Sequence, residues 1–163
     1  MIVADSGPII AFARIGRLDL LHAAMGEPVL IPRAVYAELT AHAKRRPNDE
    51  ELRDLLGKGW LEVRPITQSG TLQDMPRALH EGEQEAIALA LEVHARLLMD
   101  DSLGRREARR RGLTVLGALR VVLNAKRMGL IGKAGPVFQG MADAGYWMDD
   151  KLKHQALEEA GEA

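Results

Sequence analysis

The sequence predicts an α/β fold, a three-layer α/β/α sandwich around a parallel sheet, with additional helices at its C-terminal end. Short apolar runs alternate with helical patterns along the chain, and the runs are apolar at nearly every position. Such continuous runs are typical of parallel strands, which helices bury on both faces. The 163 residues suit a single domain. We expect its core over about 1–131 and a helical extension over about 132–163.

The expected strands and helices follow one another in regular order. Strands are predicted over residues 2–4, 28–31, 60–64, 96–100 and 113–116. Helices are predicted over residues 9–15, 18–25, 32–39, 51–56, 81–95, 103–111, 118–128, 133–144 and 149–160. Polar and turn-forming residues predict a connection over 44–50 and a loop over 67–76. Gly112 is expected to end the helix before it.

The composition excludes several kinds of site. The chain has no Cys, which rules out disulfides, thiolate metal sites and a cysteine nucleophile, and suits a cytoplasmic protein. There is no P-loop motif, so hydrolysis of nucleoside triphosphates has no support. No apolar run approaches the roughly 20 residues that span a bilayer, so no membrane association is expected. The formal net charge is −1, so a nucleic-acid partner would need a local cluster of Lys and Arg.

Acidic residues gather at one predicted edge of the sheet. Asp5 ends the first strand, and Asp100 with Asp101 ends the fourth. Ligands of open parallel sheets bind beyond these carboxyl ends. Helical spacing places Glu38 and Glu83 among apolar neighbours, on helix sides that face the core. The sequence therefore predicts a cluster of carboxylates at this edge.

Each acid also has a purely structural interpretation. Asp5 and Asp101 can cap the helices that follow them, Glu38 can lie on the surface, and Glu83 and its neighbour Glu85 can favour a helix N-terminus through the dipole. Their joint occurrence favours function, because clustered carboxylates repel each other and a hard divalent cation relieves that repulsion. The five His have no paired spacing, so Mg²⁺ or Mn²⁺ is expected rather than zinc. Metal-assisted hydrolysis of a phosphodiester is the indicated chemistry.

Four segments, in the same order along the chain, resemble the motifs of PIN-domain proteins. They are Ile2–Ile10, Ile31–Leu39, Gly82–Ala90 and Leu97–Asp101. Beyond them, residues 112–131 resemble the end of a bacterial and archaeal PIN subfamily whose members mostly lack assigned roles. The resemblance covers roughly residues 2–131.

The resemblance implies a PIN fold and a metal-dependent ribonuclease acting on single-stranded RNA. By the resemblance, Asp5 is the central ligand of Mg²⁺ or Mn²⁺, and Ser6 and Glu85 are supporting residues. The implied catalytic acids are Asp5, Glu38, Glu83 and Asp101, and the implied metal ligands are Asp5, Glu83, Asp100 and Asp101. Glu83 competes with Glu85 for the third motif, and Asp100 competes with Asp101 for the fourth.

The resemblance also implies partners. Many PIN proteins are toxins of toxin–antitoxin pairs and form homodimers, so RNA, an antitoxin protein and a second copy of the chain are expected. An alternative is a catalytically weak or inactive PIN scaffold that regulates by binding nucleic acid or protein. A phosphoacceptor receiver-like domain is disfavoured, because the first strand offers one Asp and residues 113–116 contain no Lys.

Arginines follow directly on the acids of the fourth strand. The predicted RNA-binding residues are Arg105, Arg106, Arg109 and Arg110. The alternative for this helix is a solvated surface or a docking surface for an acidic partner. With two Trp, two Tyr and two Phe, no platform for base stacking is predicted. Residues 141–157 either cover the core or form a helix pair that binds a partner.

Overall fold

The computed structural model describes residues 1–45, 52, 54–55 and 59–163. Its five strands form one parallel sheet in the order β3-β2-β1-β4-β5. They are β1 (Ile2–Ala4), β2 (Val29–Ile31), β3 (Leu61–Val63), β4 (Arg96–Leu98) and β5 (Val115–Leu116). The predicted parallel sheet is confirmed, with each strand at or inside its predicted range.

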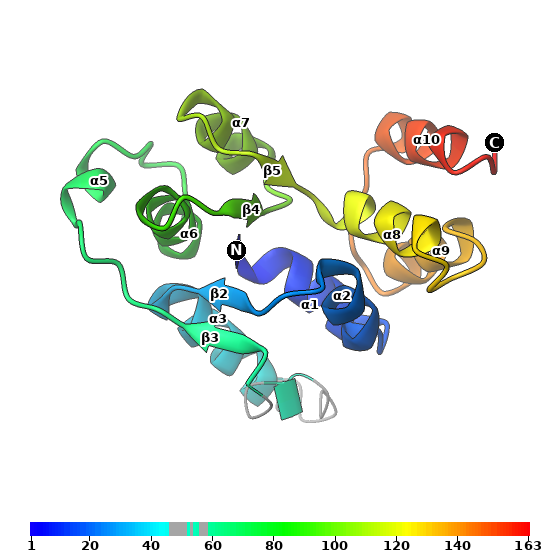
Figure 1. Ribbon diagram of the computed structural model, residues 1–163, viewed down its shortest axis with the longest axis horizontal. Coiled ribbons are helices and arrows are strands. Elements are labelled where there is room, and N and C mark those ends of the chain that lie inside the picture. The colour runs from blue at the N-terminus through cyan, green and yellow to red at the C-terminus, as the bar shows by residue number, and fades with distance from the viewer. Residues whose placement is uncertain (46–51, 53, 56–58) are drawn as a thin grey trace.

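Helices connect the strands and cover both faces of the sheet. They are α1 (Ser6–Arg14), α2 (Leu18–Met25), α3 (Arg33–Arg45), α5 (Gly70–Gln73), α6 (Glu81–Glu92), α7 (Ser102–Arg110), α8 (Ala118–Arg127), α9 (Gly135–Asp143) and α10 (Asp150–Glu159). In Figure 1, α6 and α7 lie to the left of the sheet, while α1, α2 and α8 lie to its right. Because α3 packs on α6 and α2 packs on α8, the predicted three-layer α/β/α sandwich is confirmed.

The core is apolar and largely aliphatic, as the scarcity of aromatic residues requires. All three residues of β1 are fully buried, because this strand lies in the middle of the sheet. Phe138 and Met141 of α9 are fully buried as well, so this helix covers the core. By contrast, α10 buries only Ala156. Within the described ranges, no helix is long and apolar enough to cross a membrane.

Helix α6 ends earlier than predicted, at Glu92 rather than at residue 95. The backbone N–H of Ala95 donates to the carbonyl of Ala90 at 3.0 Å, and that of His94 donates to Leu91 at 3.4 Å. This pair of bonds is a Schellman motif, which needs a left-handed residue between helix and strand. His94 supplies it with φ 53°. The same motif ends α7, where Gly112 has φ 86°, so the predicted stop at Gly112 is confirmed.

The segment predicted as a loop over 67–76 contains a helical turn, α5, so that prediction was wrong in part. Leu72 packs against the core and Met75 is buried, which holds the turn against α6. The start of the segment is fixed by Glu92, which accepts hydrogen bonds from the backbone N–H groups of Thr67 and Gln68. A few apolar contacts thus order a segment whose composition is that of a loop.

The polar connection predicted over 44–50 begins later than expected, because α3 continues through Arg45. Residues 46–50 of that connection lie outside the described residues. So do residues 51, 53 and 56, half of the helix predicted over 51–56.

The two Schellman ends give a matched pair of stability predictions. We expect His94→Gly to stabilise the fold by about 0.5–1 kcal/mol, because it removes left-handed strain of about 1–2 kcal/mol at a smaller cost in chain entropy. We expect Gly112→Ala to destabilise the fold by about 1 kcal/mol for the converse reason. Urea unfolding of both variants at one pH tests this, and a less stable His94→Gly variant would contradict it.

Candidate functional site

The predicted acids meet at the carboxyl edge of the sheet. Asp5 directly follows β1, and its backbone N–H donates to the carbonyl of Leu98 on β4 at 2.9 Å. Asp100 follows that strand two residues later, so strand pairing brings the two acids to neighbouring positions. Glu38 of α3 and Glu83 of α6 lie at the same edge, close enough to Asp5 for the negative charge of each to raise its pKa. The structure therefore brings acids from four elements together.

Asp5 is the most buried acid of the cluster. Its side chain is 6% exposed, and its Oδ1 atom is buried without a hydrogen-bond partner among the described residues. Burial raises the pKa of Asp5 to about 7; the N–H of Ser6 offsets part of this rise, and the charges of Glu38, Glu83 and Asp100 add to it. A carboxylate in this position favours either a proton or a cation beside it.

Glu38 is held in place by two neighbours. The Ser6 hydroxyl donates to its Oε2 at 2.5 Å, which gives Ser6 a supporting contact within the cluster. On its other side the carboxyl group lies against the backbone of Gly82. A Cβ atom at position 82 would lie 2.8 Å from Glu38 Cδ, so a larger residue there would displace the carboxyl group from this position. Glycine's role at the start of α6 was not recognised from the sequence.

Glu83 and Glu85, which compete for the third motif, have different surroundings. Glu83 Oε2 accepts from the backbone N–H of His80 at 2.9 Å, in a capping box at the start of α6. Burial raises the pKa of Glu83, and the charges of Asp101 and Glu38 add to the rise. Glu85 Oε2 instead accepts from the backbone N–H of Ala34 at 2.9 Å, at the start of α3. Glu83 thus interacts with the acid cluster, whereas Glu85 ties two helices together.

The adjacent acids after β4 each accept a hydrogen bond from a backbone N–H group in the first turn of a helix. Asp100 Oδ1 accepts from Ala118 N at 2.8 Å, in the first turn of α8. Asp101 Oδ2 accepts from Gly104 N at 2.7 Å as the N-cap of α7. Burial raises the pKa of Asp100, partly offset by the Tyr146 hydroxyl, the Ala118 N–H and Arg105. Asp101 is exposed, so the two acids offer one inner and one outer carboxylate.

Tyr146 is a residue of this edge that the sequence did not reveal. It lies between α9 and α10, and its hydroxyl group lies against the Asp100 carboxylate. Burial and the charge of Asp100 raise the pKa of Tyr146, so the phenol stays protonated. Because Tyr146 lies 46 positions after Asp100 in the chain, no local pattern could have linked them.

The arginines of α7 fall into two groups. Arg105 is partly buried, donates to the carbonyl of Met99 at 3.3 Å and interacts with Asp100. Arg110 donates two hydrogen bonds to the buried Glu107, at 3.0 and 2.7 Å. Arg106 and Arg109 are exposed and make no hydrogen bond or ion pair with another described side chain. Of the four arginines predicted for RNA contact, these last two are the ones whose guanidinium groups have no partner among the described side chains.

The cluster offers oxygen donors only. Across residues 1–45, 52, 54–55 and 59–163, no three His, Asp or Glu side chains stand as a group that could hold a metal ion. The chemistry of the donors nevertheless fits a hard divalent cation, since Asp5 Oδ1 lacks a partner and the carboxylates raise one another's pKa values. Holding a cation would require these side chains to turn toward a common point.

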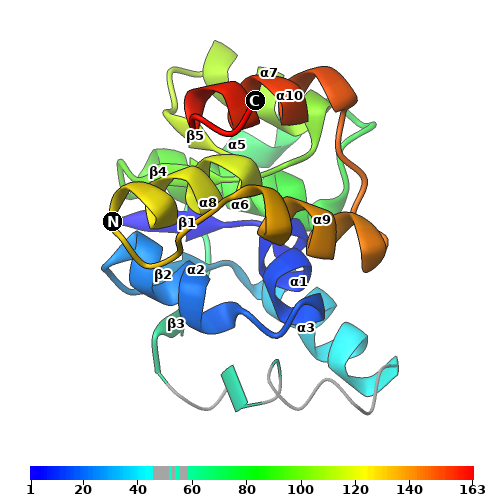
Figure 2. The same ribbon diagram turned by 90° about the vertical axis from the view of Figure 1, so that its right-hand side faces the viewer.

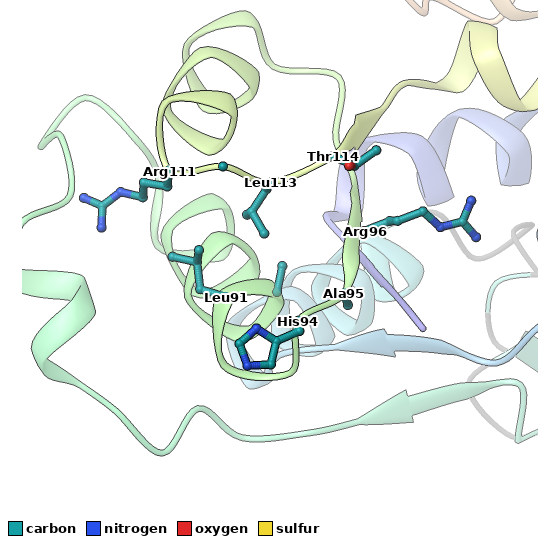
Figure 3. Close-up of a pocket in the computed structure, with 9 residues that line it drawn as sticks. Leu91, His94, Ala95, Arg96, Arg111, Leu113 and Thr114 are labelled. Atoms are coloured by element: carbon teal, nitrogen blue, oxygen red, sulfur yellow. The ribbon is translucent and has the colours of Figure 1, made fainter.

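A separate hollow of about 290 Å³ lies at the opposite edge of the sheet. Figure 3 shows His94, Arg96 and Thr114 around it. Arg96 begins β4 and Thr114 precedes β5, so this hollow lies at the amino ends of the strands. It is therefore distinct from the acid cluster.

Comparison with known proteins identifies the family. A family model described as a PIN domain matches residues 1–162. Neither the curated proteins nor the solved structures contain a match to the chain. The family match agrees with the four motifs and with the parallel α/β/α fold that places their acids on one edge. The chain therefore belongs to the PIN-domain family, whose members are generally nucleases.

Proposed function

We propose that the protein is a metal-dependent endoribonuclease that hydrolyses phosphodiester bonds of single-stranded RNA. The observation that carries this proposal is the buried Asp5 carboxyl group, which has an unpartnered oxygen and the negative charges of Glu38, Glu83 and Asp100 around it. Such an arrangement lowers the stability of the fold, so stability does not explain it. It suits a site whose charge is balanced by a divalent cation during function.

The residues proposed to hold Mg²⁺ or Mn²⁺ are Asp5, Glu83, Asp100 and Asp101. When bound, either ion would polarise the phosphate and lower the pKa of water beside it. The chain's own residues position the acids. Ser6 orients Glu38 through its 2.5 Å hydrogen bond. The N–H groups of His80, Gly104 and Ala118 fix the other carboxylates. We propose Asp5, Glu38, Glu83 and Asp101 as the catalytic acids.

For RNA contact we propose the exposed Arg106 and Arg109 as the principal phosphate partners. Both lie on α7, which begins directly after Asp101, so a phosphate backbone at the cluster would pass beside them. Arg105 and Arg110 contribute positive charge, but their guanidinium groups already bond to Met99 and Glu107. Their proposed contribution to RNA affinity is therefore smaller.

The proposal extends to the biological role on the strength of the motif resemblance. The enzyme would act as the toxin of a toxin–antitoxin pair, in the cytoplasm, as a homodimer that an antitoxin protein inhibits. A neighbouring reading frame that encodes a small DNA-binding protein would support this role. Expression of the nuclease alone should then arrest growth of the host cells, and co-expression of that protein should relieve the arrest.

A second candidate function is a PIN scaffold that binds nucleic acid or protein without cleaving it. One observation favours it: in the part of the chain that the structure describes, no three acids stand as a ready metal-binding group. Calorimetric titration with Mn²⁺ separates the two functions. A nuclease binds the ion, whereas a scaffold that has lost catalysis need not.

Replacement of the central acid tests the nuclease mechanism. We expect Asp5→Asn to reduce RNA cleavage with Mg²⁺ or Mn²⁺ by roughly 100- to 1,000-fold, because it removes a ligand whose loss costs several kcal/mol of charge stabilisation. Asp19→Asn is the matched control, since Asp19 is exposed and pairs only with Arg17 among the described residues. Undiminished cleavage by the Asp5→Asn variant would sink the mechanism.

A paired substitution separates the two glutamates of α6. Glutamine keeps the carbonyl that accepts the backbone hydrogen bond, so both Glu83→Gln and Glu85→Gln should fold. We expect Glu83→Gln to lower the cleavage rate at least about tenfold, because it neutralises a proposed ligand. Glu85→Gln should stay within about threefold of wild type, since its role is structural. The opposite order of rates would reassign the third acid to Glu85.

The raised pKa of Asp5 predicts how stability depends on pH. Because that pKa rises from 3.8 to about 7 on folding, the folded chain binds more protons than the unfolded chain between these values. The stabilising contribution is therefore complete below pH 4 and is lost as pH rises through 7. In EDTA, we expect wild type to lose roughly 2–4 kcal/mol of unfolding free energy relative to Asp5→Asn between pH 4 and 8.

Urea unfolding at intervals across that pH range measures the difference. Mg²⁺ or Mn²⁺ added at pH 8 should restore stability to wild type more than to Asp5→Asn. Parallel pH profiles for the two proteins would show that Asp5 does not titrate in this way.

A further inference from the structure

The connection between α9 and α10, residues 144–149, lies at the same edge of the sheet as the acid cluster. In Figure 2, β1 runs from the N-terminus on the left to α1 on the right, and the orange connection from α9 to α10 also lies on the right. Tyr146 of this connection places its hydroxyl group against Asp100, and it interacts with Arg105 of α7. The connection therefore borders the acid cluster directly.

Trp147 follows Tyr146 and extends into solvent. Its side chain is 80% exposed, the highest value of any large hydrophobic residue in the described part of the chain. Trp60, the other tryptophan, is partly buried and stacks on His22 with ring centroids 4.7 Å apart. Tyr146 reaches Asp100, and neighbouring Cα atoms are about 3.8 Å apart, so the backbone of Trp147 lies beside the acid cluster. An aromatic ring this exposed favours a binding role, since it contributes little to the core.

The charges near Trp147 suit a polyanion. Arg105 interacts with Tyr146, and Arg109 lies close enough to Arg105 to lower its pKa. On the other side, Lys151 of α10 is exposed within four residues of Trp147. The segment that carries Trp147 thus has the cations of α7 close to Tyr146 and a cation of α10 four positions further along the chain. Aromatic side chains combined with a basic groove are the typical means of binding single-stranded nucleic acid.

We propose that Trp147 stacks on an unpaired base of the RNA, next to the phosphate held at the acid cluster, and so restricts the substrate to single strands. This inference rests on the proposed nuclease function. A base inside a duplex is covered by its neighbours and cannot stack on a side chain, whereas an unpaired base can. Stacking is tolerant of sequence because every base has an aromatic face. Trp147 thus provides the stacking surface that the sequence composition did not predict.

Binding of a labelled RNA in EDTA tests the proposal without cleavage. The probe is a fluorescein-labelled, mixed-sequence decanucleotide, compared with its duplex and with a ribose-phosphate chain that lacks bases. We expect Trp147→Ala to weaken binding of the single strand by roughly 5- to 150-fold, with Trp147→Phe in between. Leu152→Ala is the matched control, because Leu152 is also apolar and exposed at 56% but offers no aromatic ring, and it should bind within about twofold of wild type.

Intrinsic fluorescence gives a second measurement. In a Trp60→Phe background, which keeps a ring to stack on His22, Trp147 is the one tryptophan left, so emission excited selectively from tryptophan reports on it alone. The single strand should quench this emission, and the duplex and the chain without bases should not. The proposal is overturned if Trp147→Ala binds the single strand as wild type does, if wild type does not bind it, or if the chain without bases binds equally well.

Sedimentation tests the alternative that Trp147 contacts another protein chain rather than RNA. If Trp147→Ala converts a dimer to a monomer while its affinity for RNA is unchanged, the residue belongs to a subunit interface and the proposal fails. Failure of the nuclease function has a different signature. Wild type and Asp5→Asn would then both bind the single strand through Trp147, and neither would cleave it when Mn²⁺ is added.

Discussion

The buried carboxyl group of Asp5, at the centre of the sheet edge, determines which charges the residues around it must supply. Strand pairing sets the position of Asp5, because its backbone N–H donates to the carbonyl of Leu98 on the neighbouring strand. Its Oδ1 has no hydrogen-bond partner among the described residues, and burial raises its pKa to about 7. The surrounding structure must therefore supply either charge compensation or a proton. Every other acid of the cluster has a hydrogen bond that holds it near this position.

Helix N-termini make such a gathering of acids possible. Helices α1, α3, α6, α7 and α8 all begin at the carboxyl edge. Their free backbone N–H groups and dipoles favour negative charge. Glu85, Glu83, Asp101 and Asp100 each accept a bond from the first turn or N-cap of one of these helices. The parallel topology brings the acids together, so their negative charges repel one another. It also places helix N-termini beside them, and these offset part of that repulsion.

Close packing adds a second constraint, which falls on glycines. Glu38 occupies space beside Gly82 that a Cβ atom would fill, and Asp100 Oδ1 lies 2.9 Å from where a Cβ of Gly117 would stand. Gly117 also leaves room for the guanidinium group of Arg105. These glycines keep acids and a cation close to the sheet edge, so they serve the site without carrying any functional group. That role depends on neighbours far away in the chain.

The sequence by itself determined the alternation of apolar strands and helices, the parallel sheet, and the presence of acids at strand ends. These follow from local periodicity and from the rule that parallel strands end on a common edge. The resemblance favoured Glu83 over Glu85, but only the tertiary structure showed their different contacts. It also divided the arginines of α7 into those with and those without a partner among the described residues, because such contacts join distant segments. It also brought Tyr146 to Asp100 and left Trp147 in solvent. Burial and long-range contact decide such features, and no pattern within one segment encodes them.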